Sequence, residues 1–116
     1  MKGIKHFAKS EFDCKETGEN NMDIEFLTKV DHLREICGFP FRITSGFRSK
    51  DHSVEIRKPK GGTHTQGIAC DIMCSSGSKR YTLVKHALAL GFTGIGIADS
   101  FIHVDTRTTH PVIWSY

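Results

Sequence analysis

Residues 61–73 read GGTHTQGIACDIM, and they constrain the fold and the function more than any other stretch of the chain. The alternation that begins at Gly67 predicts a strand in which Asp71 and Ile72 face opposite sides of a sheet. A carboxylate in so apolar a run is costly to bury unless it has a partner. His64 lies seven positions before Asp71, and the two side chains together suggest half of a metal site. At least one further ligand must then come from elsewhere in the chain.

The composition is that of an ordinary globular protein. The chain has 116 residues, of which 38% are hydrophobic and 25% charged, and this predicts one domain, residues 1–116, with one core. No apolar run approaches the roughly 20 residues of a membrane helix. The first residues, MKGIKHFAKSEFD, lack the apolar segment of a secretory signal. We therefore expect no membrane contact and synthesis in the cytoplasm without a signal peptide. The net charge is only +3 and the basic residues are scattered, so we also expect no nucleic-acid partner.

The cysteines favour neither disulfides nor a thiolate metal site. Four are present, at positions 14, 37, 70 and 74, and none forms a CxxC pair. We expect all four to be reduced, with Cys37 and Cys70 acting as small core residues.

Two stretches have the periodicity of helices. Residues 22–37 carry one apolar stripe, with Asn20 or Asn21 available to cap the start and Gly38 to end the helix. A second helix is predicted over residues 79–90, ending at Gly91. Its inward residues are expected to be Tyr81, Val84, Ala87 and Leu88.

Strands are predicted over residues 41–44, 67–74, 94–98 and 101–106, the last two joined by a tight turn, and the apolar tail is expected to form a last strand. Together with the two main helices they predict a small α+β domain with an antiparallel sheet. Trp114 in the tail is interpreted as a core residue rather than as a platform for substrate.

The strand predicted over residues 101–106 offers the missing metal ligand. Residues two apart share a face of a strand, so His103 and Asp105 project together. We take His103 as the candidate third ligand beside His64 and Asp71. Two imidazoles and one carboxylate leave the fourth position of a tetrahedral zinc open, which is typical of a hydrolytic site rather than a structural one.

Three motifs, in this order, resemble the M15 family of zinc D,D-peptidases. They are SGFRS at 45–49, the H-x-x-G-x-A-x-D pattern at 64–71 and FIHVDTR at 101–107. The segment FDCKETGENNMDIEFLTKVDHLRE is similar to the entry helix of the small D-Ala-D-Ala carboxypeptidase-like and phage endolysin-type members. The resemblance covers residues 7–107 and implies the fold shared by hedgehog domains and D,D-peptidases.

The resemblance also implies roles for individual residues. It implies one Zn²⁺ per chain, held by His64, Asp71 and His103. Arg48 matches the arginine that lies over the metal and binds a substrate carbonyl or carboxylate, for which a planar guanidinium is well suited. In the same motifs, Ser45 and Gln66 are further candidates for contacts with substrate.

The catalytic base departs from the family pattern. Many members carry Glu or Asp three residues before the last histidine ligand, and here that position is Ser100. The base that activates the attacking water must then be another carboxylate, and Asp105 and Asp99 are the candidates. Asp105 could equally orient a histidine ligand.

By this resemblance, the chain is expected to be a metallopeptidase that hydrolyses peptide bonds of bacterial peptidoglycan, as a carboxypeptidase or an endopeptidase, in phage-type cell-wall lysis. Its partners are expected to be wall peptides, and the protein a monomer that acts on the wall after release by a phage or as part of a virion. The bond that is cut is expected to depend on the loop at residues 53–62, and His52 is close enough to Arg48 to line the cleft. The alternative is a catalytically weak or inactive zinc-binding assembly module of a virion.

Overall fold

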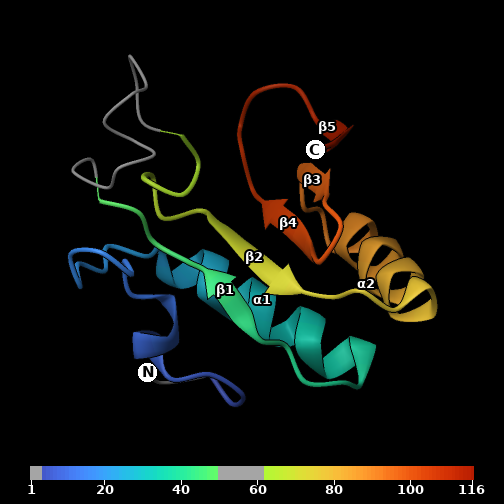
Figure 1. The fold of residues 1–116 in the computed structure, drawn as a ribbon, viewed down its shortest axis with the longest axis horizontal. Helices are drawn as coiled ribbons and strands as arrows, with labels where there is room; N and C mark the ends of the chain where they lie inside the picture. The colour runs from blue at the N-terminus through green and yellow to red at the C-terminus, as the bar shows by residue number, and fades with distance from the viewer. Residues whose placement is uncertain (1–3, 50–61) are drawn as a thin grey trace.

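The computed structural model describes residues 4–49 and 62–116, and within them two α-helices lie against one sheet (Figure 1). His52 and residues 53–61 of the predicted cleft loop lie outside the described residues. Among the described helices, none combines the length and the apolar composition that crossing a membrane requires. In chain order the elements are the 3₁₀ helix η1 (Lys9–Phe12), α1 (Ile24–Cys37), β1 (Ile43–Ser45), β2 (Ala69–Met73), α2 (Gly77–Ala89), β3 (Gly94–Ile97), β4 (Phe101–Asp105) and β5 (Val112–Ser115).

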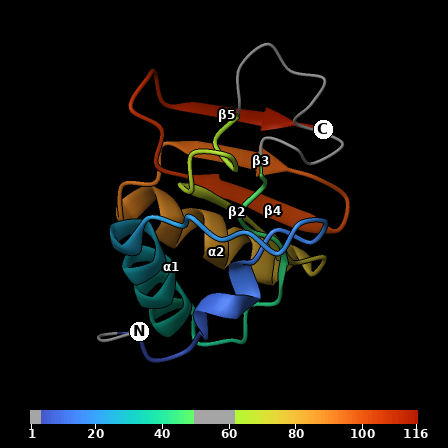
Figure 2. The same ribbon diagram turned by 90° about the vertical axis from the view of Figure 1, so that its left-hand side faces the viewer.

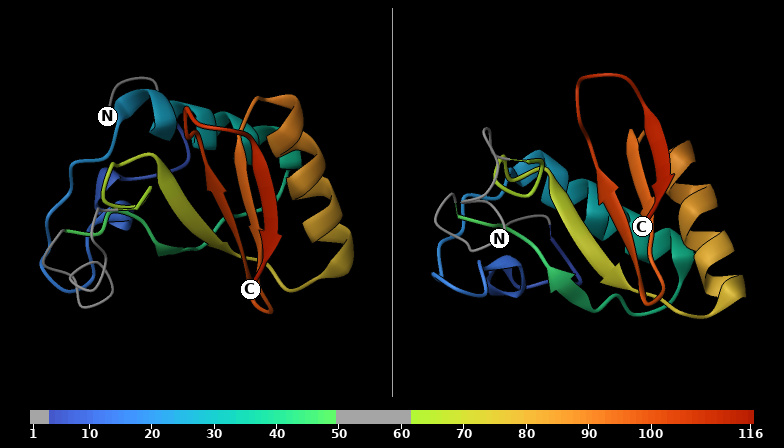
Figure 3. Two further views of the ribbon diagram at one scale, coloured as in Figure 1. Left: turned by 90° about the horizontal axis from the view of Figure 1, so that it is seen from above. Right: turned by 45° about the horizontal axis from the view of Figure 1, so that its top comes forward.

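The sheet has the strand order β1-β2-β4-β3-β5. Its pairings are antiparallel except for β3 with β5, which run parallel. The predicted α+β class with a mainly antiparallel sheet is therefore confirmed, and one edge of the sheet adds a parallel pairing. The cause is the connection at residues 106–111: it reverses the chain after β4 but carries it past β3 to the far edge (Figure 3).

Both helices cover the same face of the sheet, so the other face is left for a site (Figure 2). The covered face contributes alternate residues of the central strands to the core, because successive side chains of a strand point to opposite sides. Burying an aliphatic or aromatic side chain of this size contributes about 1.5–3 kcal/mol. The fully buried core residues of the strands and helices include Ile72, Ile95, Ile102, Val104, Phe26, Leu27, Val30, Leu33, Leu83 and Ala87.

Helix α1 begins two residues later than a cap at Asn21 would place it. The carboxylate of Asp23 caps the helix by accepting the backbone N–H of Phe26 at 2.9 Å, whereas Asn20 Oδ1 accepts the N–H of Met22 at 3.0 Å before the helix. The expectation that Asn20 or Asn21 caps the helix is therefore wrong. The predicted end is confirmed, because Gly38 adopts the left-handed conformation at φ = 76°.

Helix α2 is rotated relative to the predicted apolar stripe. Leu83 and Ala87 are fully buried, whereas Tyr81 and Leu88 are 71% and 48% exposed. Only Ala87 of the predicted inward residues is fully buried. Arg80 accounts for the rotation, because its guanidinium donates hydrogen bonds to the backbone carbonyls of Cys74, Ala98 and Asp99. These bonds hold the helix with Arg80 facing the ends of β2 and β3.

The cysteines also divide by environment. Cys70 is fully buried, as expected for a core residue, and burial raises the pKa of its thiol well above the usual value. Cys37 is only half-buried at the end of α1, although burial still raises its pKa to about 11. The two thiols therefore stay protonated and uncharged near neutral pH.

Candidate metal centre

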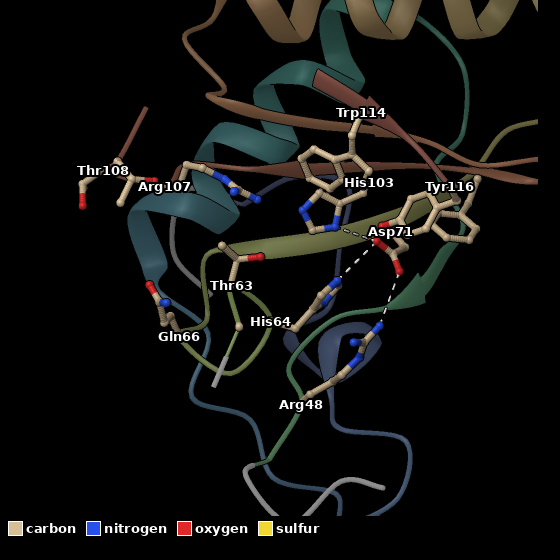
Figure 4. Close-up of a pocket in the computed structure, with 13 residues that line it drawn as sticks. Arg48, Thr63, His64, Gln66, Asp71, His103, Arg107, Thr108, Trp114 and Tyr116 are labelled. Carbon is tan, nitrogen blue, oxygen red and sulfur yellow. Dashed lines mark hydrogen bonds and ion pairs between the residues drawn. The ribbon is translucent and has the colours of Figure 1, made fainter. Parts of the chain in front are cut away.

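One row of residues crosses the whole width of the sheet on the face opposite the helices. The strand register aligns Ser45 with Asp71, Asp71 with His103, His103 with Gly96, and Gly96 with Trp114. Residues paired in this way project side by side. The pairing of β2 with β4 therefore places a carboxylate and an imidazole next to each other, under the indole of the edge strand (Figure 4).

His64 reaches the same point from the turn before β2. Its Nδ1 lies 2.8 Å from the carbonyl oxygen of Gly46, and because a carbonyl can only accept, Nδ1 carries the proton. Its Nε2 is therefore the nitrogen that faces the site, 3.3 Å from Asp71 Oδ1. Gly67 closes this turn at φ = 76°, and its carbonyl accepts the backbone N–H of Asp23 at 2.9 Å. The turn is thus anchored to the start of α1.

His103 is oriented by a buried carboxylate behind it. Its Nε2 lies 2.7 Å from Asp105 Oδ2, and its Nδ1 lies 3.0 Å from Asp71 Oδ1. Asp105 has no exposed surface and accepts three further hydrogen bonds from Arg107, through the backbone N–H, Nε and Nη2. An Asp105 carboxylate can only accept, so it keeps a proton of His103 on Nε2, and Nδ1 is the nitrogen that a metal would take.

Two glycines of β3 make room for this arrangement. A Cβ at Gly94 would collide with the carboxylate of Asp105, and a Cβ at Gly96 would lie 2.8 Å from the indole of Trp114. The ring centroids of Trp114 and His103 are 5.1 Å apart. Trp114 is half-buried and lines the pocket, so its interpretation as a core residue is wrong. The pattern Gly94-x-Gly96, in the strand beside His103, is the sequence signal that could have revealed the space it occupies.

The three donor atoms fit a tetrahedral metal. Each of His64, Asp71 and His103 offers a ligand atom within 4.8 Å of those of the other two, and His64 Nε2 and His103 Nδ1 are 3.3 and 3.0 Å from Asp71 Oδ1. Metal–ligand bonds of 2.0–2.1 Å in a tetrahedron place neighbouring ligand atoms about 3.3 Å apart. All three residues are at most 5% exposed, and their free side opens into a pocket of about 650 Å³. The site can therefore hold zinc with one position facing the pocket.

The carboxylates of the cluster are ionised, and their negative charge suits a bound cation. Burial alone would raise the pKa of Asp71, but hydrogen bonds from His103 and His64 lower it to about 2. Burial is likewise outweighed at Asp105, where hydrogen bonds from His103 and Arg107 hold the pKa well below its usual range. Both carboxylates are therefore ionised at neutral pH, and together with two imidazoles they offer a cation a charge-complementary site.

The other predicted residues are placed unequally around this centre. Arg48 lines the pocket with its Nη2 3.8 Å from Asp71 Oδ2, and its Nε donates to Ser45 Oγ at 3.3 Å. Gln66 also lines the pocket. Ser45 does not line it, but it accepts the hydrogen bond from Arg48. Asp99 is exposed in the turn between β3 and β4 and does not line the pocket. Arg107 is a site residue that the sequence did not single out.

The turn that carries His64 depends on Gly67, and we expect Gly67→Ala to be strongly destabilising. A Cβ there would collide with the carbonyl of Asn21, in addition to the cost of a positive φ. The left-handed conformation costs about 1–2 kcal/mol, and overpacking adds about 1–3 kcal/mol. Gly18→Ala is the matched control, because Gly18 has φ = 77° but open space around it. Denaturant unfolding should show a clearly larger loss in the free energy of unfolding for Gly67→Ala than for Gly18→Ala. Equal losses would mean that the contact with Asn21 does not add to the destabilisation.

A comparison with protein families identifies the chain. The model of a family described as Peptidase M15 matches residues 5–105. The match includes His64, Asp71 and His103 and stops before Arg107 and Trp114. No curated protein matches the sequence.

Proposed function

Because the chain belongs to the peptidase M15 family, we propose that it is a zinc peptidase that hydrolyses peptide bonds in the stem peptides of bacterial peptidoglycan. The observation that carries this proposal is the convergence of His64 Nε2, Asp71 Oδ1 and His103 Nδ1 at the floor of an open pocket. Zinc bound there would polarise the scissile carbonyl and lower the pKa of a coordinated water to about 7. In this proposal the protein is a carboxypeptidase or an endopeptidase of the phage lytic type, and it acts on the cell wall as a monomer.

Arg48 is the residue best placed to bind the substrate beside the metal. Its guanidinium lines the pocket 3.8 Å from Asp71 Oδ2, and hydrogen bonding to Ser45 fixes its direction. A guanidinium can donate two parallel hydrogen bonds to a carboxylate, or one to the carbonyl oxygen on which negative charge develops. Arg48 would thus bind the substrate and stabilise the transition state, while Gln66 provides a further polar contact at the pocket wall.

Asp105 is better suited to orient His103 than to act as the base. Its carboxylate is fully buried and already accepts hydrogen bonds from His103 and Arg107, so it has no path to a water in the pocket. Asp99 is exposed in a turn outside the pocket. We therefore assign Asp105 a positioning role. Among the described residues that line the pocket, Asp71 is the one carboxylate, and its Oδ2 faces Arg48 rather than the imidazoles.

Digestion of purified peptidoglycan tests the proposed function. We expect the protein to carry one zinc per chain and to release wall peptides, because the site combines a metal with an open substrate pocket. Treatment with a chelator should stop the release, and added Zn²⁺ should restore it. The measurement is chromatography of the released peptides together with elemental analysis of the protein. Zinc at one per chain without any release would contradict the enzymatic proposal.

A second candidate is a zinc-binding assembly module without hydrolytic activity. It is favoured by one observation: the position that holds the base in many family members is Ser100, and the described pocket wall supplies no carboxylate besides Asp71. A hydroxyl cannot take a proton from water near neutral pH. In this alternative the metal would stabilise the fold, and removing it should lower the melting temperature although no wall peptide is ever released.

A further inference from the structure

The pocket has two chemically different ends, on either side of His103. At one end Thr63, Gln66, Thr108 and Arg107 present hydroxyl, amide and guanidinium groups (Figure 4). At the other end, beyond Asp71, Tyr116 lines the pocket, with Trp114 between the two ends. Phe101 also lines the pocket, and its ring lies against that of Tyr116. A peptide lying across the metal would therefore place its two neighbouring residues in unlike surroundings.

The aromatic end is a continuous row of rings that starts at the metal centre. Ring centroids are 5.1 Å apart for His103 and Trp114, 6.2 Å for Trp114 and Tyr116, and 5.2 Å for Tyr116 and Phe101. Tyr116 remains 68% exposed, so much of its ring is accessible from the pocket. An exposed aromatic row at a pocket wall can cover an apolar side chain and remove it from water.

The row is held in place without substrate. The backbone N–H of Tyr116 donates to the carbonyl of Ile97 at 3.1 Å, which fixes the end of β5 on β3. Trp114 occupies the space left by Gly96, and the guanidinium of Arg107 lies 5.0 Å from its ring. Because these contacts order the rings in advance, binding a side chain against them costs little conformational entropy.

The charges of the pocket decide which side chain fits. Aromatic rings can also bind cations, but Arg48 is paired with Asp71 and Arg107 with Asp105, so a bound divalent metal would leave the pocket positive. A cationic side chain is therefore disfavoured, and an anionic group is better placed beside the metal and Arg48. An uncharged apolar side chain remains as the group that the aromatic end accepts.

We propose that Phe101, Trp114 and Tyr116 form a specificity subsite for an uncharged apolar side chain next to the scissile bond. The proposal rests on the proposed function, because it assigns a substrate residue to the same pocket. Trp114 and Tyr116 lie outside the family match, which ends at residue 105, whereas Phe101 lies inside it. The subsite selects the peptide residue, while the metal centre selects the reaction.

Variants of the two tyrosines separate the subsite from general surface effects. Tyr116→Ala removes the exposed ring, Tyr116→Phe keeps the ring without the hydroxyl, and Tyr81→Ala removes an equally exposed ring from α2, away from the pocket. The substrates are two synthetic stem peptides that differ only in whether alanine or aspartate flanks the scissile bond. We expect Tyr116→Ala to lose about tenfold in kcat/KM on the alanine peptide, mainly through KM, and much less on the aspartate peptide. Tyr81→Ala should match the wild type, Tyr116→Phe should keep the preference for the alanine peptide because the ring remains, and zinc content should be unchanged in all variants.

A binding measurement distinguishes failure of the subsite from failure of the proposed function. Trp114 is the one tryptophan of the chain, so its fluorescence reports on this pocket alone. Titrating the metal-free protein with the alanine peptide should change the emission of the wild type at about tenfold lower concentration than that of Tyr116→Ala. Equal titration curves for these two proteins would overturn the subsite, even if the wild type hydrolyses both peptides. A difference between the curves without any hydrolysis would support the subsite and contradict the enzymatic proposal.

Discussion

Replacing His64 with alanine is expected to remove zinc from the protein and to abolish peptide hydrolysis. His64 supplies one of the three donor atoms, and its Nδ1–H bond to Gly46 directs Nε2 at the site. Loss of a group that merely orients a ligand lowers metal affinity about 10- to 100-fold, so loss of a ligand itself should exceed about 100-fold. Elemental analysis after gel filtration, together with the rate of peptide release, measures both effects.

The control for this variant is a histidine of the surface. His32 is exposed on α1, and His32→Ala should keep both zinc and activity. Circular dichroism of His64→Ala should show a folded protein, because the side chain contributes little to the hydrophobic core. If His64→Ala retained one zinc per chain and full hydrolysis, the metal centre would be assigned to the wrong residues.

The second large effect is expected for Asp105→Asn. The carboxylate accepts hydrogen bonds from His103 and Arg107, and an amide can accept at only one of its two heavy atoms. The variant should therefore lose control over which nitrogen of His103 is protonated, and its zinc affinity should fall about 10- to 100-fold. The buried groups left without an acceptor should lower the free energy of unfolding by about 1–3 kcal/mol. Competition with a fluorescent zinc chelator and denaturant unfolding measure these quantities.

This variant also separates the two possible roles of Asp105. A positioning residue loses zinc affinity, and its activity recovers at least partly when zinc is added in excess. A general base would instead lose kcat at full zinc occupancy, and that result would overturn the role assigned here. Asp99→Asn is the matched control, because Asp99 is exposed in the turn between β3 and β4 and should be silent in both measurements.

The sequence predicted the three residues that converge at the candidate metal site because local rules place two of them. Alternation in a strand puts Asp71 on the face opposite Ile72, and spacing by two puts His103 and Asp105 together. Proximity in the sequence joined His64 to Asp71, and the family motifs supported the set of three. What alternation could not supply is the register between β2 and β4, which sets Asp71 directly beside His103. Register follows from turns and long-range packing, and a single strand does not contain it.

The remaining differences have physical causes that lie outside the local pattern. The rotation of α2 is fixed by bonds from Arg80 to carbonyls of two separate segments, which the apolar pattern of the helix does not contain. The parallel pairing of β5 depends on where residues 106–111 carry the chain. This pairing also places Trp114 over His103, so the aromatic wall could not be predicted from the sequence of the tail alone. Asp105 could be recognised as buried only once Arg107 and Gly94 were seen around it.

The central claim is that zinc binds to three specific atoms, and crystals of the zinc-loaded protein test it most directly. Anomalous scattering at the zinc edge should give one strong peak per chain, about 2.0–2.2 Å from His64 Nε2, Asp71 Oδ1 and His103 Nδ1. The side chain of Asp105 should remain bonded to His103 Nε2 and take no part in coordination. A peak elsewhere on the described surface, or coordination through Asp105 in place of Asp71, would contradict the account.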